Sequence, residues 1–299
     1  MLKHILVPLD GSHMAEMALP TTALLASKLE ASVTLIHVIE HNAPQRVHGD
    51  HHLTNQAEAS AYLSLVAQTY FPSGIQVDCH VHTEEVQNVA ASIVNHAGEF
   101  LPDLIVMCAH GSSGLHEFMV GNIAQQVIAH GKTPLLLLRP DECGDAPVIN
   151  RILVALDGIS EHEKGLPLVA RLAAAFSASL HLVQVVPTLG TLNFNQAAAG
   201  RLLPGTTTVM LEIAESEAQQ HLAEHVAEWQ ATGLQVHAEV RRGDPVPQVV
   251  AAAQDSDLIV IGTHGKAGMK AFWSGSVASK IITQTHLPIL LIPVNVIFS

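Results

Sequence analysis

The chain contains little cysteine, and its cysteines are scattered. Of 299 residues only 3 are cysteines, namely Cys79, Cys108 and Cys143, and they form no Cys-x-x-Cys motif. An odd, widely spaced set is not typical of a disulfide framework or a zinc ribbon. We therefore expect a protein of a reducing compartment.

Long apolar runs are absent as well. Apolar residues make up 48% of the chain, yet no run approaches the roughly 18 uncharged apolar residues that a membrane helix needs. The opening segment 1–8 has neither the apolar h-region nor the small-residue cleavage site of a signal peptide. These features predict a cytoplasmic protein with no membrane partner.

Cations are scarce, with 14 Lys and Arg against 27 Asp and Glu and a formal net charge of −13. Nucleic acids are bound mainly through Lys and Arg that neutralise phosphates, so no nucleic-acid partner is expected. The deficit is uneven, because residues 1–150 hold 5 cations against 15 acids, whereas 151–299 hold 9 against 12. The second half therefore tolerates an anion better. Its cations Arg241, Arg242, Lys266 and Lys270 should reach one end of a sheet, or else are ordinary solvated charges.

What the sequence does contain is an internal repeat. The stretch that begins at Arg151 echoes the one that begins at His4, and the stretch Asp257–Gly265 echoes Asp103–Gly111. Such self-similarity indicates a tandem duplication. We expect two domains of about 140 residues, a usual single-core size. Their predicted bounds are 1–144 and 148–299.

Short apolar runs alternate with segments of helical periodicity in each repeat. Strands are expected at 5–9, 33–39, 75–81, 104–108 and 134–138, and again at 152–156, 180–186, 236–240, 258–262 and 288–292, with helices ending near 70 and spanning about 210–229. Alternating strands and helices favour parallel βαβ units, and continuous apolar strands favour helices on both faces. The fold class predicted is α/β, with two tandem doubly wound open parallel sheets of five strands each. Ligands of such sheets bind beyond the strand C-termini.

A glycine pattern follows the fourth strand of the second repeat. Gly262 and Gly265 are separated by two residues, and nine residues later Gly275-Ser276 opens a helix. Glycines allow close backbone approach, and a helix N-terminus favours an anion, so the pattern predicts a phosphate site. Alternatively, these glycines only make turns and Ser276 is only a helix cap. No Gly-x4-Gly-Lys-Ser/Thr and no Gly-x-Gly-x-x-Gly occurs, so a P-loop and a dinucleotide fingerprint are both excluded.

The spacing Gly-x2-Gly-x9-Gly-Ser resembles that of the nucleotide-binding universal stress proteins. The resemblance covers nearly the whole chain as two family domains and implies a Rossmann-like, adenine nucleotide alpha-hydrolase-like fold. It implies that ATP, with or without Mg²⁺, binds in the second domain. It further implies that the halves pack as an internal pseudo-dimer through their last strands, with further homo-oligomerisation open. The residues expected at the nucleotide are Ala155, Leu156, Asp157, Val185, Ile261, Gly262, His264, Gly265, Gly275, Ser276 and Val277.

The first repeat departs from the pattern at two of its four positions. It has Cys108 at the first glycine and Asn122 at the hydroxyl position, and Glu117 adds a negative charge. Each change disfavours a polyphosphate. We expect a degenerate first domain in which Gly111, Gly121 and Asp10 keep the turns of the fold.

Histidines are abundant, 20 in all, and 13 of them lie in 1–150. The loop cluster His41, His48, His51 and His52 is interpreted as solvated rather than as a metal site, and His37 as a hydrogen-bonded core residue. On one predicted helix His221 and His225 could pair on a metal. However, Leu222 replaces the glutamate of a His-Glu-x-x-His motif, which favours boundary positions instead.

Catalysis has little support in the sequence, because no Gly-x-Ser-x-Gly elbow occurs. Three functions stay open at this point. The first is an ATP-binding stress-response regulator. The others are an interaction scaffold without nucleotide and a slow ATPase. Mutation of Gly275 and Ser276 would separate the first from the second.

Overall fold

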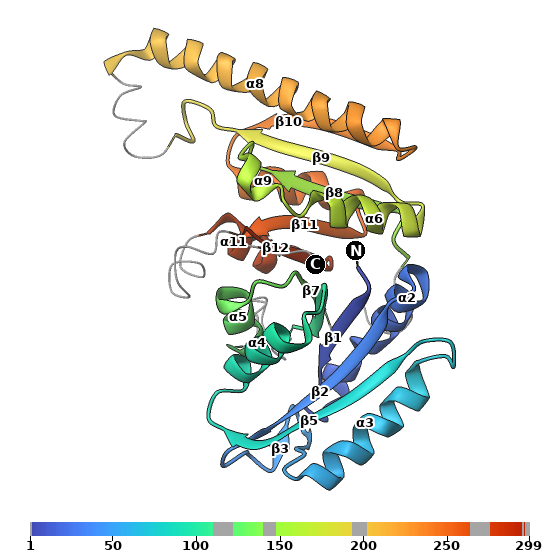
Figure 1. The fold of residues 1–299 in the computed structure, drawn as a ribbon. Helices are drawn as coiled ribbons and strands as arrows, with labels where there is room; N and C mark the ends of the chain where they lie inside the picture. The colour runs from blue at the N-terminus through green and yellow to red at the C-terminus, as the bar shows by residue number, and fades with distance from the viewer. Residues whose placement is uncertain are drawn as a thin grey trace.

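The computed structural model describes residues 2–109, 122–139, 148–192, 202–263, 276–294 and 296. Its main feature is one ten-stranded sheet in the order β10-β9-β8-β11-β12-β7-β6-β1-β2-β5 (Figure 1). The strands of the first half are β1 (His4–Pro8), β2 (Ser32–Glu40), β5 (Val77–Val86), β6 (Leu104–Cys108) and β7 (Leu135–Leu138). Those of the second half are β8 (Arg151–Leu156), β9 (Ser179–Val186), β10 (Val236–Arg242), β11 (Leu258–Thr263) and β12 (Ile289–Pro293).

Within each half all neighbouring strands are parallel. The chain starts in the middle of each five-stranded part, moves outward to β5 or β10, and then returns to the other side of the first strand. The predicted doubly wound α/β fold is therefore confirmed. Each predicted strand is present, with ends displaced by a few residues.

The two halves join through their last strands. Strands β7 and β12 pair antiparallel, with Leu136 opposite Leu290. The guanidinium of Arg139, directly after β7, donates through Nη2 to the carbonyl oxygen of Ile282 in the second half. The expected pseudo-dimer through the last strands is thus present as one continuous sheet, and this pairing covers an edge that each half would otherwise expose.

Helices cover both faces of the sheet. One face packs against α2 (Leu19–Leu29), α3 (Gln56–Tyr70), α6 (Leu166–Phe176) and α8 (Pro204–Ala231), and the other against α4 (Val89–Phe100), α5 (Asn122–His130), α9 (Pro245–Ala252) and α11 (Val277–Gln284). Along β1, Ile5 and Val7 enter one apolar core and Leu6 the other. This alternation explains why buried parallel strands read as unbroken apolar runs.

Short elements complete the described fold. A short helix α1 (His13–Glu16) follows β1, and 3-10 turns occur at η2 (Ser160–His162) and η3 (Ala253–Asp255). A small hairpin, β3 (Arg46–Val47) with β4 (Asp50–His51), lies in the segment where the sequence predicted only loop. Helix α8 begins at Pro204, earlier than predicted, with the proline in its first turn, where a missing amide costs nothing. No helix among the described residues is long and apolar enough to cross a membrane.

Candidate functional site

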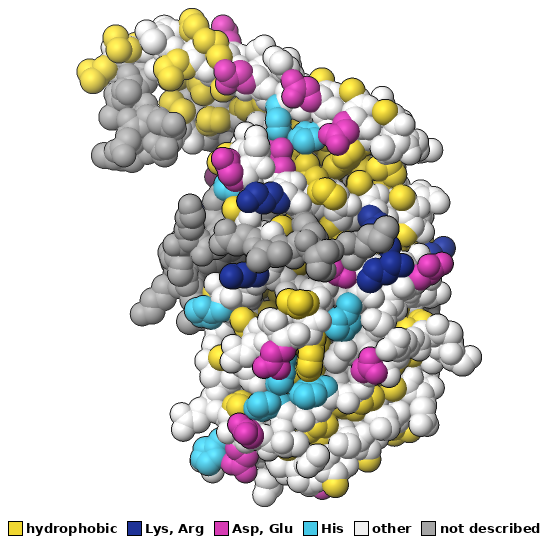
Figure 2. Space-filling view, viewed as in Figure 1, with side chains coloured by type: hydrophobic (Ala, Val, Ile, Leu, Met, Phe, Trp, Pro, Cys, Tyr) yellow, Lys and Arg dark blue, Asp and Glu magenta, His cyan; other side chains and the backbone are white. Residues whose placement is uncertain are grey.

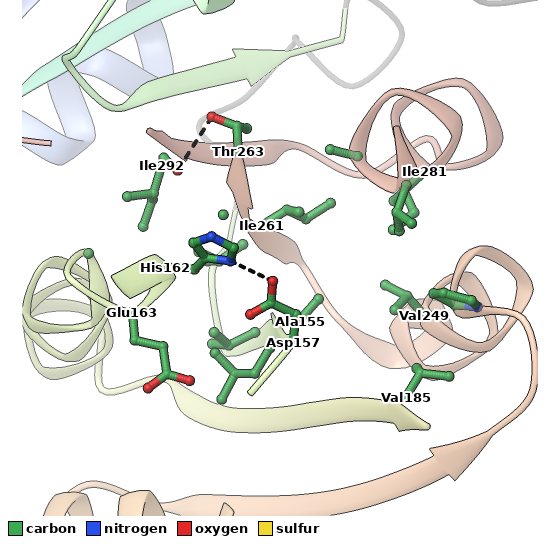
Figure 3. Close-up of a pocket in the computed structure, with 18 of the residues that line it drawn as sticks. Ala155, Asp157, His162, Glu163, Val185, Val249, Ile261, Thr263, Ile281 and Ile292 are labelled. Carbon is green, nitrogen blue, oxygen red and sulfur yellow. Dashed lines mark hydrogen bonds and ion pairs between the residues drawn. The ribbon is translucent and has the colours of Figure 1, made fainter. Parts of the chain in front are cut away.

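A cavity of about 480 Å³ lies at the carboxyl ends of β8, β9 and β11. Figure 3 shows its walls, with Ala155 and Asp157 from β8 and the turn after it, Val185 from β9, Ile261 from β11, and Ile281 from α11. Eight of the residues predicted from sequence line it: Ala155, Leu156, Asp157, Val185, Ile261, Gly262, Ser276 and Val277. The other three, His264, Gly265 and Gly275, lie outside the described residues.

Sheet register brings these positions together. Ala155 lies between Val183 of β9 and Ile261 of β11 in the parallel ladder. The next residues of all three strands therefore leave the sheet at the same edge. Strand β8 is the point from which the chain winds outward in both directions, and such a switch point opens a crevice at the strand ends.

Gly262 occupies the end of β11 where it approaches the turn after β8. A Cβ built there would lie 3.4 Å from the carbonyl oxygen of His162 and 3.8 Å from its Cβ. Packing therefore does not forbid a side chain at this position, and such a side chain would occupy the space between β11 and the turn. The glycine keeps the backbone of β11 accessible on the cavity side.

The N-terminus of α11 supplies the polar end of the cavity. Ser276 is the N-cap, and its Oγ accepts a hydrogen bond from the amide of Ser279 at 3.1 Å. Amides at the first positions of a helix have no intrahelical acceptor, and the helix dipole adds positive potential there. Ser276 and Val277 also line the cavity, so this end of the helix faces it.

The turn after β8 holds an acidic group. Oδ1 of Asp157 accepts from the amide of Ile159 at 3.1 Å, and its Oδ2 lies 2.6 Å from Nδ1 of His162 (Figure 3). Gly158 has φ +76°, and a Cβ on it would approach Nε2 of Gln184 to 2.6 Å. The backbone angle therefore favours glycine here, and a side chain would in addition displace the amide of Gln184. The result is a compact turn that presents Asp157 to the cavity.

The remaining walls are apolar. They come from the sheet and from the helices on one of its faces, and include Val154, Leu166, Val249, Val260, Ala278 and Ile292. An apolar enclosure with a few polar groups at one end is the usual arrangement of a small-molecule site. A flat, weakly polar ring suits the apolar part, and an anion suits the helix end.

The first half keeps a matching cavity of about 760 Å³. Its lining includes Pro8, Leu9, Asp10, Val38, Met107, Cys108, Asn122 and Ile123, the repeat equivalents of the eight residues above. Cys108 places a buried side chain at the position where Gly262 has none. Oδ1 of Asn122 accepts a hydrogen bond from Nε2 of Gln126 at 3.1 Å. Oδ1 of Asp10 accepts from the amide and the hydroxyl of Ser12, and Oδ2 lies 3.8 Å from Nε2 of His48, whereas the repeat equivalent of His162 is Ala15. Residues Gly111 and Gly121 lie outside the described residues.

The histidine predictions have mixed outcomes. His37 is buried, and its ring nitrogens lie 2.8 Å from the carbonyl oxygen of Leu9 and 3.1 Å from that of Leu53, so the core interpretation is confirmed. In the loop cluster, His52 is buried with Nδ1 3.1 Å from the carbonyl oxygen of Pro44, which corrects the solvated interpretation for this residue. Its ring also lies 6.4 Å from that of His37, centroid to centroid.

The sequence did not indicate that Glu163 joins His221 and His225. The carboxylate follows η2, whereas the histidines lie on α8, and only the fold brings them together. Desolvation by burial opposes the charge on Glu163, but hydrogen bonds and positive charge from the histidines prevail and lower its pKa. The hydrogen bond to Glu163 raises the pKa of His225 against the effect of burial.

Comparison with known proteins gives the relationship of the chain. A model of the universal stress protein family matches residues 1–139 and 149–293. A universal stress protein of Mycolicibacterium smegmatis is 22% identical over 318 residues, covering 96% of both chains. One from Mycobacterium tuberculosis is 24% identical over 305 residues, covering 96% of this chain and 95% of its own.

Solved structures share the fold. A universal stress protein from Archaeoglobus fulgidus superposes with a TM-score of 0.66 at 17% identity, covering 97% of this chain and 96% of its own. A Pseudomonas aeruginosa protein described as functionally unknown gives 0.70 at 18%, covering 98% and 93%. With two family matches that together span most of the sequence, the chain belongs to the universal stress protein family and is a tandem, two-domain member of it.

Proposed function

We propose that the second half binds an adenine nucleotide, ATP with or without Mg²⁺, in the cavity at the ends of β8, β9 and β11. The observation that carries the proposal is the convergence of eight predicted residues on this one cavity. The apolar walls take the adenine ring, and the N-terminus of α11 takes the phosphates. The glycine spacing of nucleotide-binding family members, unbroken from Gly262 to Ser276, supports this orientation.

Three features favour a phosphate at the α11 end. The hydroxyl of Ser276 accepts from Ser279, which leaves its own proton available to a phosphate oxygen. The first amides of the helix point toward the same space. Gly262 leaves room for the chain of phosphates to pass β11. In the proposal His264, Gly265 and Gly275 complete the cradle.

The proposal assigns the nucleotide to one half only. Cys108 brings a sulfur to the position that Gly262 leaves open, and the amide of Asn122 replaces the hydroxyl of Ser276. Domain 1, residues 1–144, then serves as the structural partner, and domain 2, residues 148–299, carries the bound state. We propose that the protein is a stress-response regulator whose signal is whether its second domain has nucleotide bound. A phosphate site that binds the ground state and the transition state of ATP hydrolysis equally well gives no rate enhancement, so hydrolysis is not part of the proposal.

Calorimetric titration of the nucleotide-stripped full chain with ATP and Mg²⁺ tests this function. One site per chain is expected, lost in Gly275→Val and retained in Gly121→Val, its repeat equivalent in the first half. Two sites would overturn the assignment to a single half. The absence of binding in the unaltered chain would overturn the function and favour an interaction scaffold.

A further inference from the structure

A carboxylate and two imidazoles converge beside the nucleotide cavity. Nε2 of His221 lies 2.9 Å from Oε1 of Glu163, and Nε2 of His225 lies 3.1 Å from Oε2. The candidate ligand atoms of the three residues lie within 4.8 Å of one another. Figure 3 shows the carboxylate of Glu163 pointing away from His162, and Figure 2 shows histidine side chains on the surface beneath α8.

The orientation of His221 is set by a second polar contact. Its Nδ1 lies 3.1 Å from Oε1 of Gln184, an acceptor, so Nδ1 carries the ring proton. In the neutral imidazole the lone pair is then on Nε2, which faces Oε1 of Glu163. Neither of these two buried atoms has a hydrogen-bond partner within the described part of the chain. In this tautomer two electron-rich atoms are in contact, and a positive charge between them, a proton or a metal ion, removes the repulsion.

The three side chains are largely withdrawn from solvent. The exposed fraction is 10% for Glu163, 22% for His221 and 17% for His225. A buried carboxylate requires compensation by charge or hydrogen bonds, because its transfer from water is costly. The remaining exposure leaves a route by which a small ion can enter.

We propose that Glu163, His221 and His225 form a binding site for a divalent transition-metal ion, with Zn²⁺ as the best-matched species. Histidines four apart on a helix present their rings on one face, and two imidazoles with one carboxylate are an established donor set for Zn²⁺. Tetrahedral ligands at about 2.1 Å from a metal lie roughly 3.4 Å apart. The observed separations of 2.9 and 3.1 Å are therefore close to those of a formed site.

Gln184 acts as the positioning residue of this site. By holding Nδ1–H of His221 it directs the Nε2 lone pair toward the metal position, as carbonyl and carboxylate acceptors do behind metal-bound histidines. Gln184 is itself buried, and its amide packs against Gly158. The metal would thus tie α8 to the turn that carries Asp157.

Glu163 lines the edge of the cavity assigned to the nucleotide, but none of the three ligands belongs to the glycine motif. Two come from α8 and one is the residue after η2. A second histidine group, His80, His82 and His96, also falls within ligand distance in the first half. Metal titrations are therefore best made in a His82→Ala background, which removes a donor from that group.

The test is titration of the chelator-treated, nucleotide-free full chain, in the His82→Ala background, with Zn²⁺ against a chromophoric chelator. One equivalent is expected to bind. Titration with Co²⁺ is expected to give the visible absorption of a four- or five-coordinate ion with nitrogen and oxygen ligands. This spectrum tests the site without any substitution in it.

Substitutions then locate the ion. Glu163→Gln, His221→Ala and His225→Ala are each expected to weaken Zn²⁺ binding at least tenfold. Gln184→Leu should weaken it by about 10- to 100-fold, the range for residues that orient metal ligands. The matched control is His237→Ala, which removes an exposed histidine of the same half and should leave binding unchanged.

Three results would overturn the site. The first is no Zn²⁺ binding and no Co²⁺ absorption. The second is full affinity in Glu163→Gln, which keeps the shape and an acceptor but not the charge. The third is an equal loss in His237→Ala. All three are read from nucleotide-free protein, whereas the nucleotide proposal is read from ATP titration of the unaltered chain, so failure of the metal site is distinguishable from failure of the nucleotide proposal.

Discussion

Cys108 and Gly262 occupy the same place in the two halves of the sheet. Cys108 pairs with Leu138 at the end of β7, and Gly262 pairs with Ile292 near the end of β12. A buried sulfur therefore lies in one cavity where the other has bare backbone. This difference lies between repeat-equivalent strand ends, and it can be tested by making the second half resemble the first at this position.

Gly262→Cys is expected to weaken ATP binding without unfolding the protein. The new Cβ would meet its nearest neighbour at 3.4 Å, an ordinary contact, so the thermal midpoint should change little. The sulfur would extend into the space assigned to phosphates, and we expect at least about a tenfold loss, which corresponds to roughly 1.4 kcal/mol. Calorimetry measures the affinity and circular dichroism the midpoint.

The control for this variant is Gly98→Ala, in α4, where a Cβ meets no atom within 4 Å. Alanine is the better helix former, so this variant should be stable and bind ATP normally. Unchanged affinity in Gly262→Cys would contradict the assigned path of the phosphates.

Ser276→Asp separates the two roles of Ser276. Aspartate caps a helix as well as serine, so α11 should keep its stability. The carboxylate, however, would repel a phosphate at the same position, and binding should fall by at least about tenfold. Ser276→Ala should instead lower the free energy of unfolding by about 1 kcal/mol, because the helix cap is missing, and it adds no charge that would repel a phosphate. Urea denaturation and ATP titration measure the two effects.

If Ser276→Asp binds ATP as well as the unaltered chain does, then Ser276 is only a helix cap. That result would support the alternative in which the glycines merely form turns. Because the same substitution changes charge and conserves the cap, a loss of binding cannot be attributed to fraying of α11.

The sequence was sufficient to predict every strand of the large sheet. Buried parallel strands such as β6 and β11 are nearly unbroken apolar runs. Because the sequence is an internal repeat, each strand of one half is supported by an equivalent run in the other half. The family resemblance also placed eight of the residues that line the cavity, because they follow strands whose carboxyl ends share one edge. The lining residues from the turn after β8, from α6 and from α9, such as His162, Leu166 and Val249, were not predicted.

The parts that sequence did not predict depend on contacts between distant segments. The hairpin β3–β4 consists of two-residue strands without periodicity. Glu163 meets His221 and His225 only because α8 packs across β9. His52 is buried in a loop whose chain returns to β2, where its ring lies 6.4 Å from that of His37. No local pattern contains these distances, which are set by packing.

Leu290→Ala is expected to destabilise both halves together. Leu290 is 1% exposed and lies opposite Leu136 at the junction of β12 and β7. Truncation of a buried leucine costs about 2–5 kcal/mol through lost contacts and a residual cavity. Urea denaturation followed by circular dichroism and by tryptophan fluorescence should show this loss.

The matched control is Leu65→Ala on α3, because Leu65 is 64% exposed and its truncation should change stability by no more than about 0.5 kcal/mol. In the double variant Leu136→Ala/Leu290→Ala, the losses should not be additive, since the two residues are direct neighbours. Strict additivity would contradict the pairing of β7 with β12.

His181 predicts a pH dependence of stability. Desolvation by burial lowers its pKa from the ordinary value of 6.5, and the positive charge of Arg241 and the proximity of His237 act in the same direction, while Glu239 opposes them. Folding therefore disfavours protonation of this ring. Its contribution to stability is present above pH 6.5 and is lost as the pH falls through the lowered pKa.

Relative to His181→Gln, which cannot protonate, the unaltered chain should lose free energy of unfolding between pH 7.5 and pH 5, as urea denaturation at both values would show. The exposed His286→Gln variant corrects for the loss of one titrating group. A constant difference would mean that Glu239 cancels the effect of burial, and an advantage of the unaltered chain that grows at low pH would mean that Glu239 outweighs it.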